Sequence, residues 1–153
     1  MKILIAVDGS EPALDAVRHG LALVRAGLKT TFLLAAVQEP VYLYELVLPP
    51  DTEVLERFSG AQGGQALSGA EGLFNAAGVP YQREIGSGDP APTLIDMVRR
   101  YDCDAIIMGA RGRGALRSAL LGSVSQRVVH EAAVPVTIVK HIQPERVAGS
   151  GGG

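Results

Sequence analysis

The chain has 153 residues, the length of one compact domain with a single sizeable core. Hydrophobic residues make up 47% of the sequence and charged residues 20%, which excludes a chain that is disordered throughout. The net charge of −2 argues against a nucleic-acid-coating protein, and no apolar run approaches the length of about 18 residues that crosses a bilayer. The one cysteine, Cys103, excludes an internal disulfide and a paired-cysteine zinc or redox site. We therefore expect a soluble, cytoplasmic protein.

Five short apolar segments alternate with helical patterns along the chain. The predicted strands cover residues 2–8, 30–37, 79–85, 105–108 and 134–140. The predicted helices run from Ser10 to Gly27 and over 51–77, 89–101 and 123–132. Because parallel strands need a crossover between them, this alternation predicts an α/β fold with an open five-stranded parallel sheet and helices on both faces. Such sheets bind ligands at the carboxyl ends of their strands, so the loops after the first and fourth strands are the expected site.

The loop after the fourth strand is rich in glycine, serine and arginine. It starts at Gly109 and leads through Gly122 into a helix, where Ser123 and Gln126 are spaced as a capping box. Residues 105–130 contain four arginines and no acidic residue, a charge of +4 against −6 for the rest of the chain. Glycine exposes backbone N–H groups and a helix N-terminus favours an anion, so we interpret the loop as a phosphate site. The alternative is that the glycines only shape the loop, the arginines only solubilise it and the serine only caps the helix.

Other phosphate-related patterns do not fit. The P-loop requires a lysine, and no lysine lies within residues 30–139. The segment from Gly112 lacks the last glycine of the dinucleotide pattern GxGxxG and follows the fourth strand instead of the first. A receiver domain is disfavoured because Gly9 follows Asp8 where a second acidic residue is expected, and Asp89 is better interpreted as a helix cap.

The spacing Gly109-x2-Gly112-x9-Gly122-Ser123 matches the nucleotide-binding pattern G-x2-G-x9-G-[S/T] of the universal stress proteins. Residues 2–10, 88–91 and 134–140 are similar to the family's opening strand, third helix start and final strand. The chain therefore resembles this family over 1–142, which we expect to form one nucleotide-binding domain. Residues 143–153 are expected to form a flexible glycine-rich tail.

The resemblance implies a Rossmann-like sheet of order 3-2-1-4-5 that binds an adenine nucleotide, such as ATP, across the ends of strands one and four. Asp8 would contact the sugar, Ala6 and Ala36 would lie near the adenine, and Met108 and Gly109 would line the nucleoside pocket. Ala6 stands where some ATP-binding members have proline, and Ala36 where a larger aliphatic residue is frequent. The phosphates would be held by Gly112, Gly122, Ser123, Val124 and Ser125. Mg²⁺ would be bound through the phosphates, with no direct protein ligand.

The remaining reactive side chains do not suggest catalysis. Cys103 precedes a strand with no predicted base nearby, so we interpret it as a structural thiol. The three histidines are too scattered to predict a metal site: His19, His130 and His141. Tyr42 and Tyr44 either cover the nucleotide or pack against a partner or the core, and the role of 41–78 stays open.

The leading interpretation is a stress-response regulatory protein in which bound adenine nucleotide changes conformation or partner choice. The alternative is a slow ATPase or phosphotransferase that uses the same loop. No residue is identified that would orient an attacking nucleophile, because Asp8 is the one acid predicted near the site and is assigned to the sugar. A third interpretation, an anion or nucleic-acid binder acting through the arginine-rich loop, predicts strong loss of affinity with salt.

The last strand, from Val134 to Lys140, predicts a homodimer. In the order that the resemblance implies, this strand lies at an edge of the sheet, where its N–H and C=O groups remain available for pairing. Pro135 cannot donate a ladder hydrogen bond, which fits an edge strand. The alternative is a monomer whose edge is shielded by residues 41–50.

Overall fold

The computed structural model of the chain describes residues 1–39, 52–111 and 121–141. Strands and helices alternate within these residues, as the apolar segments predict. The strands are β1 Lys2–Ala6, β2 Thr31–Gln38, β3 Gln82–Ser87, β4 Ala105–Gly109 and β5 Val136–Val139. The helices are α1 Glu11–Arg25, α3 Thr52–Ala77, α4 Pro90–Arg100 and α5 Ser123–Glu131. The expected tail, 143–153, lies outside the described residues.

The strands form one parallel sheet of order β3-β2-β1-β4-β5. Strand β1 lies at the centre, where Ile5 is in register with Leu34 of β2 on one side and Ile107 of β4 on the other. The chain moves outward from β1 to β3 and then returns across the sheet to β4. The predicted fold class and strand order are therefore confirmed.

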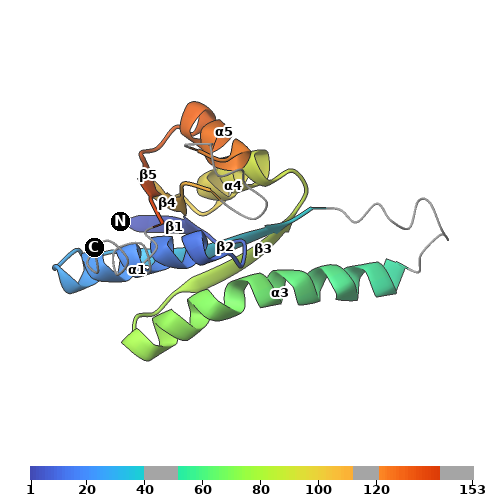
Figure 1. The fold of residues 1–153 in the computed structure, drawn as a ribbon, viewed down its shortest axis with the longest axis horizontal. Helices are drawn as coiled ribbons and strands as arrows, with labels where there is room; N and C mark the ends of the chain where they lie inside the picture. The colour runs from blue at the N-terminus through green and yellow to red at the C-terminus, as the bar shows by residue number, and fades with distance from the viewer. Residues whose placement is uncertain (40–51, 112–120, 142–153) are drawn as a thin grey trace, which may run out of the picture.

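Within the described ranges, two helices cover each face of the sheet. Helices α1 and α3 lie on one face and α4 and α5 on the other (Figure 1). Side chains alternate between the faces along each strand, so that Ile3 and Ile5 of β1 point toward α1 and α3 while Leu4 points toward α4 and α5. Each face therefore buries its own apolar cluster, and β1, β2 and β4 have the nearly continuous hydrophobic sequence of strands covered on both sides.

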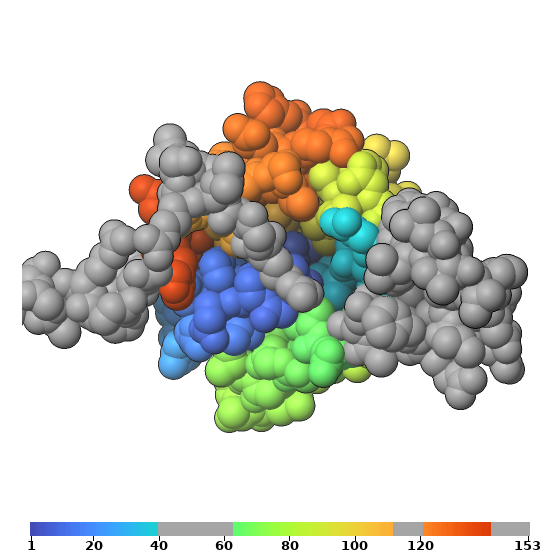
Figure 2. Space-filling view, turned by 45° about the vertical axis from the view of Figure 1, so that its right-hand side comes forward, coloured from blue at the N-terminus to red at the C-terminus, as the bar shows by residue number. Residues whose placement is uncertain are grey.

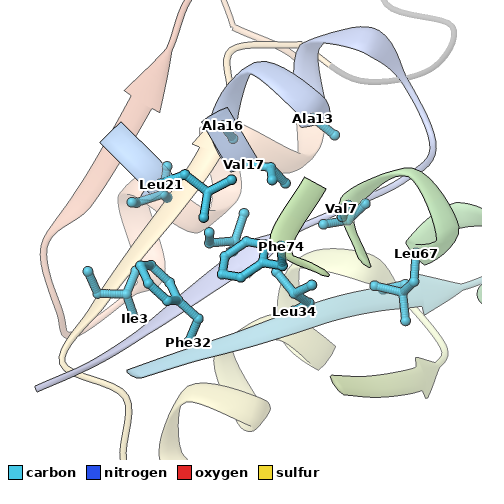
Figure 3. Close-up of a cluster of buried hydrophobic side chains, with 14 residues drawn as sticks. Ile3, Val7, Ala13, Ala16, Val17, Leu21, Phe32, Leu34, Leu67 and Phe74 are labelled. Atoms are coloured by element: carbon cyan, nitrogen blue, oxygen red, sulfur yellow. The ribbon is translucent and has the colours of Figure 1, made fainter. Parts of the chain in front are cut away.

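The larger cluster lies beneath α1 and α3. Phe74 of α3 lies among side chains from α1 and the strands, and its ring meets that of Phe32 edge to face with centroids 5.1 Å apart (Figure 3). Val17 and Leu21 of α1 complete this packing, in agreement with the helical spacing of the sequence. On the other face, the buried cluster is built from Leu33, Leu94, Met97, Ile106 and Val128.

The third strand begins later than its apolar segment predicts, at Gln82 instead of Val79. Gly78 adopts a positive φ of 70° and ends α3, and the N–H of Val79 then donates to the carbonyl of Phe74. Val79 and Tyr81 pack on the cluster under α3 instead of pairing with β2. The hydrophobic residues after Gly78 therefore pack on the core between the end of α3 and the start of β3.

The first and last strands are shorter than predicted. Strand β1 ends at Ala6, because the chain turns at Asp8 toward α1. Strand β5 covers Val136–Val139 and is an edge strand, as expected. No helix within the described ranges is long and apolar enough to cross a membrane.

Candidate functional site

The carboxyl ends of β1, β2 and β4 surround a pocket of about 1100 Å³. Because β1 lies between β2 and β4, the loops that leave β1 and β4 diverge to opposite faces and open a crevice between them. Figure 2 shows the segments that meet there: the blue β1–α1 region, the cyan end of β2, the green helix α3 and the orange helix α5. The pocket thus lies where the direction of the strand order reverses.

Nine of the ten predicted site residues line this pocket. They are Ala6, Asp8, Ala36, Met108, Gly109, Gly122, Ser123, Val124 and Ser125. The tenth, Gly112, lies outside the described residues. Residues separated by more than 100 positions in the sequence are therefore brought to one site by the parallel pairing of β1 with β4.

The carboxylate of Asp8 is held in place at the end of β1. Its Oδ1 accepts hydrogen bonds from the Ser10 backbone N–H at 2.9 Å and from the Ser10 hydroxyl at 2.5 Å. The Ser10 hydroxyl also accepts from the N–H of Ala13, which makes Ser10 the predicted N-cap of α1. Gly9 between them has a φ of 85°, a conformation that favours glycine. The turn therefore couples the start of α1 to the position of the Asp8 carboxylate.

Gly109 permits a close approach between β4 and α1. A Cβ at this position would lie 2.9 Å from the carbonyl oxygen of Pro12, which is backbone and cannot easily give way. Pro12 is in the first turn of α1, where it needs no N–H partner. The glycine at position 109, which lines the pocket, is thus explained by the close packing of α1 on β4.

The start of α5 presents backbone N–H groups at the far end of the pocket. Gly122 is the N-cap and Ser123 is the first helical residue, so the expectation that Ser123 itself caps the helix is wrong. The N–H groups of Ser123, Val124 and Ser125 lie in the first turn of α5, where backbone N–H groups have no partner within the helix. This arrangement, with the positive end of the helix dipole, suits an anion.

Ser125 performs a structural task at this helix start. Its side chain is only 3% exposed, and its hydroxyl lies 2.7 Å from the carbonyl oxygen of Ala110, to which it donates. The N–H of Gly122 donates to the same carbonyl at 2.8 Å. The two bonds hold the end of β4 against the start of α5. A hydroxyl has one proton, so the Ser125 hydroxyl is engaged within the protein and its backbone N–H remains for a ligand.

Two of the four arginines in residues 105–130 lie in the described part of the chain, and their surroundings differ. Arg111 lines the pocket. Arg127 lies on α5 and binds Asp89 at 2.7 Å and Glu131 at 3.1 Å, and these hydrogen bonds raise the pKa of Arg127. Asp89 occupies the N-cap position of α4, as expected, but its carboxylate binds Arg127 and does not bond to the helix start. The other two arginines, Arg113 and Arg117, lie outside the described residues.

Apart from Ala36, the sequence did not predict the residues that β2 and α3 contribute. Gln38 and Glu39 line the pocket at the end of β2, so Asp8 is not its only acid. Helix α3 contributes small or polar residues, and α4 contributes two more: Gly63, Gln65, Ala66, Ser68, Pro90 and Leu94. The adjacency of β2 and β1 could have indicated Gln38 and Glu39, because neighbouring parallel strands end at the same edge.

Other polar groups of the described chain lie away from this site. Cys103 is buried, and this burial raises the pKa of its thiol, in keeping with a structural role. His141 binds Asp15 of α1, and His130 is exposed on α5. Among the described residues, no three His, Cys, Asp or Glu side chains gather to hold a metal ion.

The chain matches the family model described as the universal stress protein family over residues 1–140. The chain belongs to this family. A universal stress protein of Thermus aquaticus is 36% identical over 144 residues, which cover 90% of this chain and 97% of that protein. Universal stress protein MJ0531 of Methanocaldococcus jannaschii is 28% identical, covering 94% of this chain and 84% of that protein.

A solved structure of the universal stress protein family gives the same picture. The Arabidopsis thaliana protein At3g01520, crystallised with AMP bound, is 26% identical and superposes with a TM-score of 0.69. The match covers 95% of this chain and 94% of the Arabidopsis chain. The predicted family, fold and strand order are therefore confirmed together.

Proposed function

We propose that this universal stress protein binds an adenine nucleotide in the pocket at the ends of β1, β2 and β4, and acts as a stress-response regulator. The observation that carries the proposal is the meeting of a helix N-terminus, a positioned carboxylate and an apolar strand end in one pocket. The AMP bound to the Arabidopsis relative supports the ligand class. ATP is the nucleotide that we propose for this chain.

The residues that line the pocket can be assigned to the phosphates, the ribose and the base of a nucleotide. The N–H groups at the start of α5 would receive the phosphates. Asp8, held by Ser10, would accept hydrogen bonds from the ribose hydroxyls. Ala36 and Met108, from β2 and β4, offer apolar surface for the base. Mg²⁺ would be bound by the phosphates of ATP and would neutralise part of their charge.

The proposal is for binding and regulation, without rapid turnover. The carboxylates among the described lining residues are Asp8 and Glu39, which lie at the ends of β1 and β2 and not on α5. Asp8 is already bonded to Ser10. A cytoplasmic location belongs to the same proposal, because the cell holds its adenine nucleotides there, and cell fractionation tests it.

We further propose that the protein forms a homodimer through β5. The carbonyl of Pro135 accepts from the N–H of Ile106 in β4, and that of Val139 from the N–H of Ala110 directly after β4. The backbone N–H and C=O groups of Val136 and Ile138 therefore point to the free edge of the sheet. Antiparallel pairing with the same strand of a second copy about a two-fold axis would satisfy those groups in both chains.

Mass spectrometry of small molecules released from freshly purified protein tests the ligand class directly. We expect ATP, ADP or AMP in near-stoichiometric amount, or adenine-nucleotide binding after the pocket has been emptied. Protein that is folded, releases no nucleotide and takes up none at millimolar concentration would contradict the proposal. A Gly122→Val variant purified in parallel is the control, because it changes the start of α5 and leaves the rest of the pocket intact.

A further inference from the structure

The carboxylate of Asp89 binds another helix instead of the one whose start it occupies. Asp89 is the N-cap residue of α4, but its side chain makes no bond to the helix start. An N-cap side chain usually accepts from the second or third N–H of its helix, and the third residue of α4 is Pro92, which has no N–H. The carboxylate binds Nη1 of Arg127 on α5 at 2.7 Å. The sequence of α4 thus leaves this carboxylate available for a bond between helices.

Both partners of this ion pair are held by further contacts. The carbonyl of Asp89 accepts from the N–H of Thr93 at 3.1 Å and from the Thr93 hydroxyl at 2.7 Å. Gly88 before it has a φ of 133°, and its N–H donates to the carbonyl at the end of β2. On α5, Nε of Arg127 donates to Glu131 at 3.1 Å. The ion pair therefore joins the turn after β3 to a guanidinium that a second contact orients.

Helix α5 has few other attachments to the described part of the chain. Of its nine residues, Ser125 and Val128 are buried. Between described residues, its side chains bond to other elements at two places alone. Ser125 donates to the carbonyl of Ala110, directly after β4. Arg127 donates to Asp89 at the start of α4, which lies beside α5 on the same face of the sheet (Figure 1). The two bonds therefore hold α5 from the side of β4 and from the side of α4.

The ion pair lies beside the pocket and not in its wall. Arg127 follows Ser123 by four residues, so the two side chains are on the same side of α5. Ser123 lines the pocket, and so does Pro90, the residue after Asp89. Asp89 and Arg127 are not among the described residues that line it. The pair can therefore fix the direction of the α5 start without touching a ligand.

We propose that Arg127 is a positioning residue whose ion pair with Asp89 holds the first turn of α5 in the orientation that binds the phosphate group of the nucleotide. This inference rests on the proposed nucleotide binding. The N–H groups of a helix start bind an anion when they point at it, so a rotation of α5 would misdirect them together. The exposed fractions of the two side chains are 47% for Arg127 and 63% for Asp89, and exposed ion pairs add little to stability. The effect is therefore expected in phosphate affinity and not in the melting temperature.

Two other roles of the pair predict different results. If Arg127 acted by its charge alone, removal of the Asp89 carboxylate would strengthen the binding of an anion, because the site would become more positive. If the pair only fastened two helices, its loss would leave ligand binding unchanged. A positioning role predicts that loss of either partner weakens phosphate binding, and that loss of both is no worse than loss of one.

The test measures the binding of AMP and adenosine by isothermal titration calorimetry. Adenosine has the same base and sugar but no phosphate, so the ratio of the two affinities reports on the phosphate end of the pocket. The variants are Asp89→Ala, Arg127→Met and the double variant. The matched controls are Asp96→Ala and Arg100→Met, which break an ion pair of similar exposure within α4. Neither control residue is among the described residues that line the pocket.

We expect wild type and the controls to prefer AMP to the same degree. The two single variants and the double variant should each reduce that preference by about three- to five-fold, with the affinity for adenosine unchanged. Tighter AMP binding by Asp89→Ala would overturn the positioning role in favour of charge alone. An unchanged AMP preference in every variant, or equal weakening of both ligands, would also overturn it, although nucleotide binding stands. Wild-type protein that binds neither ligand contradicts the proposed function itself.

Discussion

Asp8 and Ser10 are joined by two hydrogen bonds to one carboxylate oxygen, at 2.9 Å from the Ser10 N–H and 2.5 Å from its hydroxyl. The same hydroxyl caps α1 through the N–H of Ala13. The end of the central strand, the start of the first helix and the carboxylate of the pocket are therefore one structural unit. A change to Ser10 should alter both the stability of the fold and the properties of the pocket.

We predict that Ser10→Ala lowers the free energy of unfolding by about 1 kcal/mol, because α1 loses its cap. The same change should weaken AMP binding several-fold, because the Asp8 carboxylate loses one of the bonds that orient it. Urea unfolding and calorimetry measure the two effects. Ser87→Ala, at an exposed position of β3, is the control. A variant with wild-type stability and affinity would show that the Asp8–Ser10 turn has neither role.

Gly109→Ala should destabilise the protein, by about 1–3 kcal/mol if the neighbouring backbone shifts only partly. The added Cβ would meet the Pro12 carbonyl at 2.9 Å and push α1 away from β4. Gly64→Ala is the matched control, since a Cβ there meets nothing within 4 Å and alanine favours the helix by up to about 1 kcal/mol. We expect denaturation experiments to give opposite signs for the two variants. Equal effects would contradict the close packing of α1 on Gly109.

The proposed dimer predicts a mass of about 32 kDa in light scattering, twice the chain mass of 16.0 kDa. Ile138→Lys should shift the mass toward that of one chain, because it places a charge beside the edge groups that pair. Val129→Lys is a control at an α5 side chain that is 44% exposed and away from β5. Wild-type protein that remains at the mass of one chain across micromolar concentrations would exclude the dimer.

Cys103 should be nearly unreactive in the folded protein. Burial is the main cause that raises the pKa of its thiol, with the charge of Lys2 acting against it. The folded state therefore favours the neutral thiol, so any stability that this group contributes is present below the pKa of the unfolded thiol and decreases as pH rises above it. We expect slow alkylation by iodoacetamide at pH 8 and fast alkylation in urea. Equally fast labelling in both conditions would show an accessible thiolate.

The overall fold was predictable because it depends on local patterns. Apolar segments separated by helical periodicity fix the number of strands and the parallel sheet, and Ser10 and Pro12 mark the start of α1. The boundaries were less accurate where a local signal competes with the pattern. Val79 looks like strand sequence, but Gly78 before it adopts a positive φ and ends α3, and the next residues pack on the cluster under α3 before β3 begins at Gln82.

The site was predictable where a single loop carries a motif. It was not predictable where it depends on contacts between residues far apart in the sequence. The spacing from Gly109 to Ser123 indicated residues that, where the structure describes them, line one pocket. The bond from Ser125 to the Ala110 carbonyl spans 15 positions, and no local pattern shows that this hydroxyl is already engaged. Gln38 likewise gains its burial from Gly63, which approaches only when α3 folds over β2. Such tertiary contacts are not encoded in a short motif.

Gly122→Val should abolish nucleotide binding while the protein remains folded. The backbone of Gly122 has φ −73° and ψ 168°, an extended conformation that valine adopts without strain. The branched side chain would stand in front of the N–H groups at the start of α5, where the phosphates are proposed to lie. Circular dichroism confirms the fold, and calorimetry with ATP measures the loss. Wild-type affinity in a folded variant would place the phosphates elsewhere.

The most direct test of nucleotide binding is the thermal stability of ligand-free protein with and without MgATP. A ligand at 100 times its dissociation constant stabilises the folded state by about 2.7 kcal/mol, so the melting temperature should rise with MgATP concentration. Gly122→Val should show no such rise. A wild-type melting temperature that millimolar MgATP leaves unchanged, in protein shown to be folded and free of nucleotide, would contradict ATP binding in the pocket.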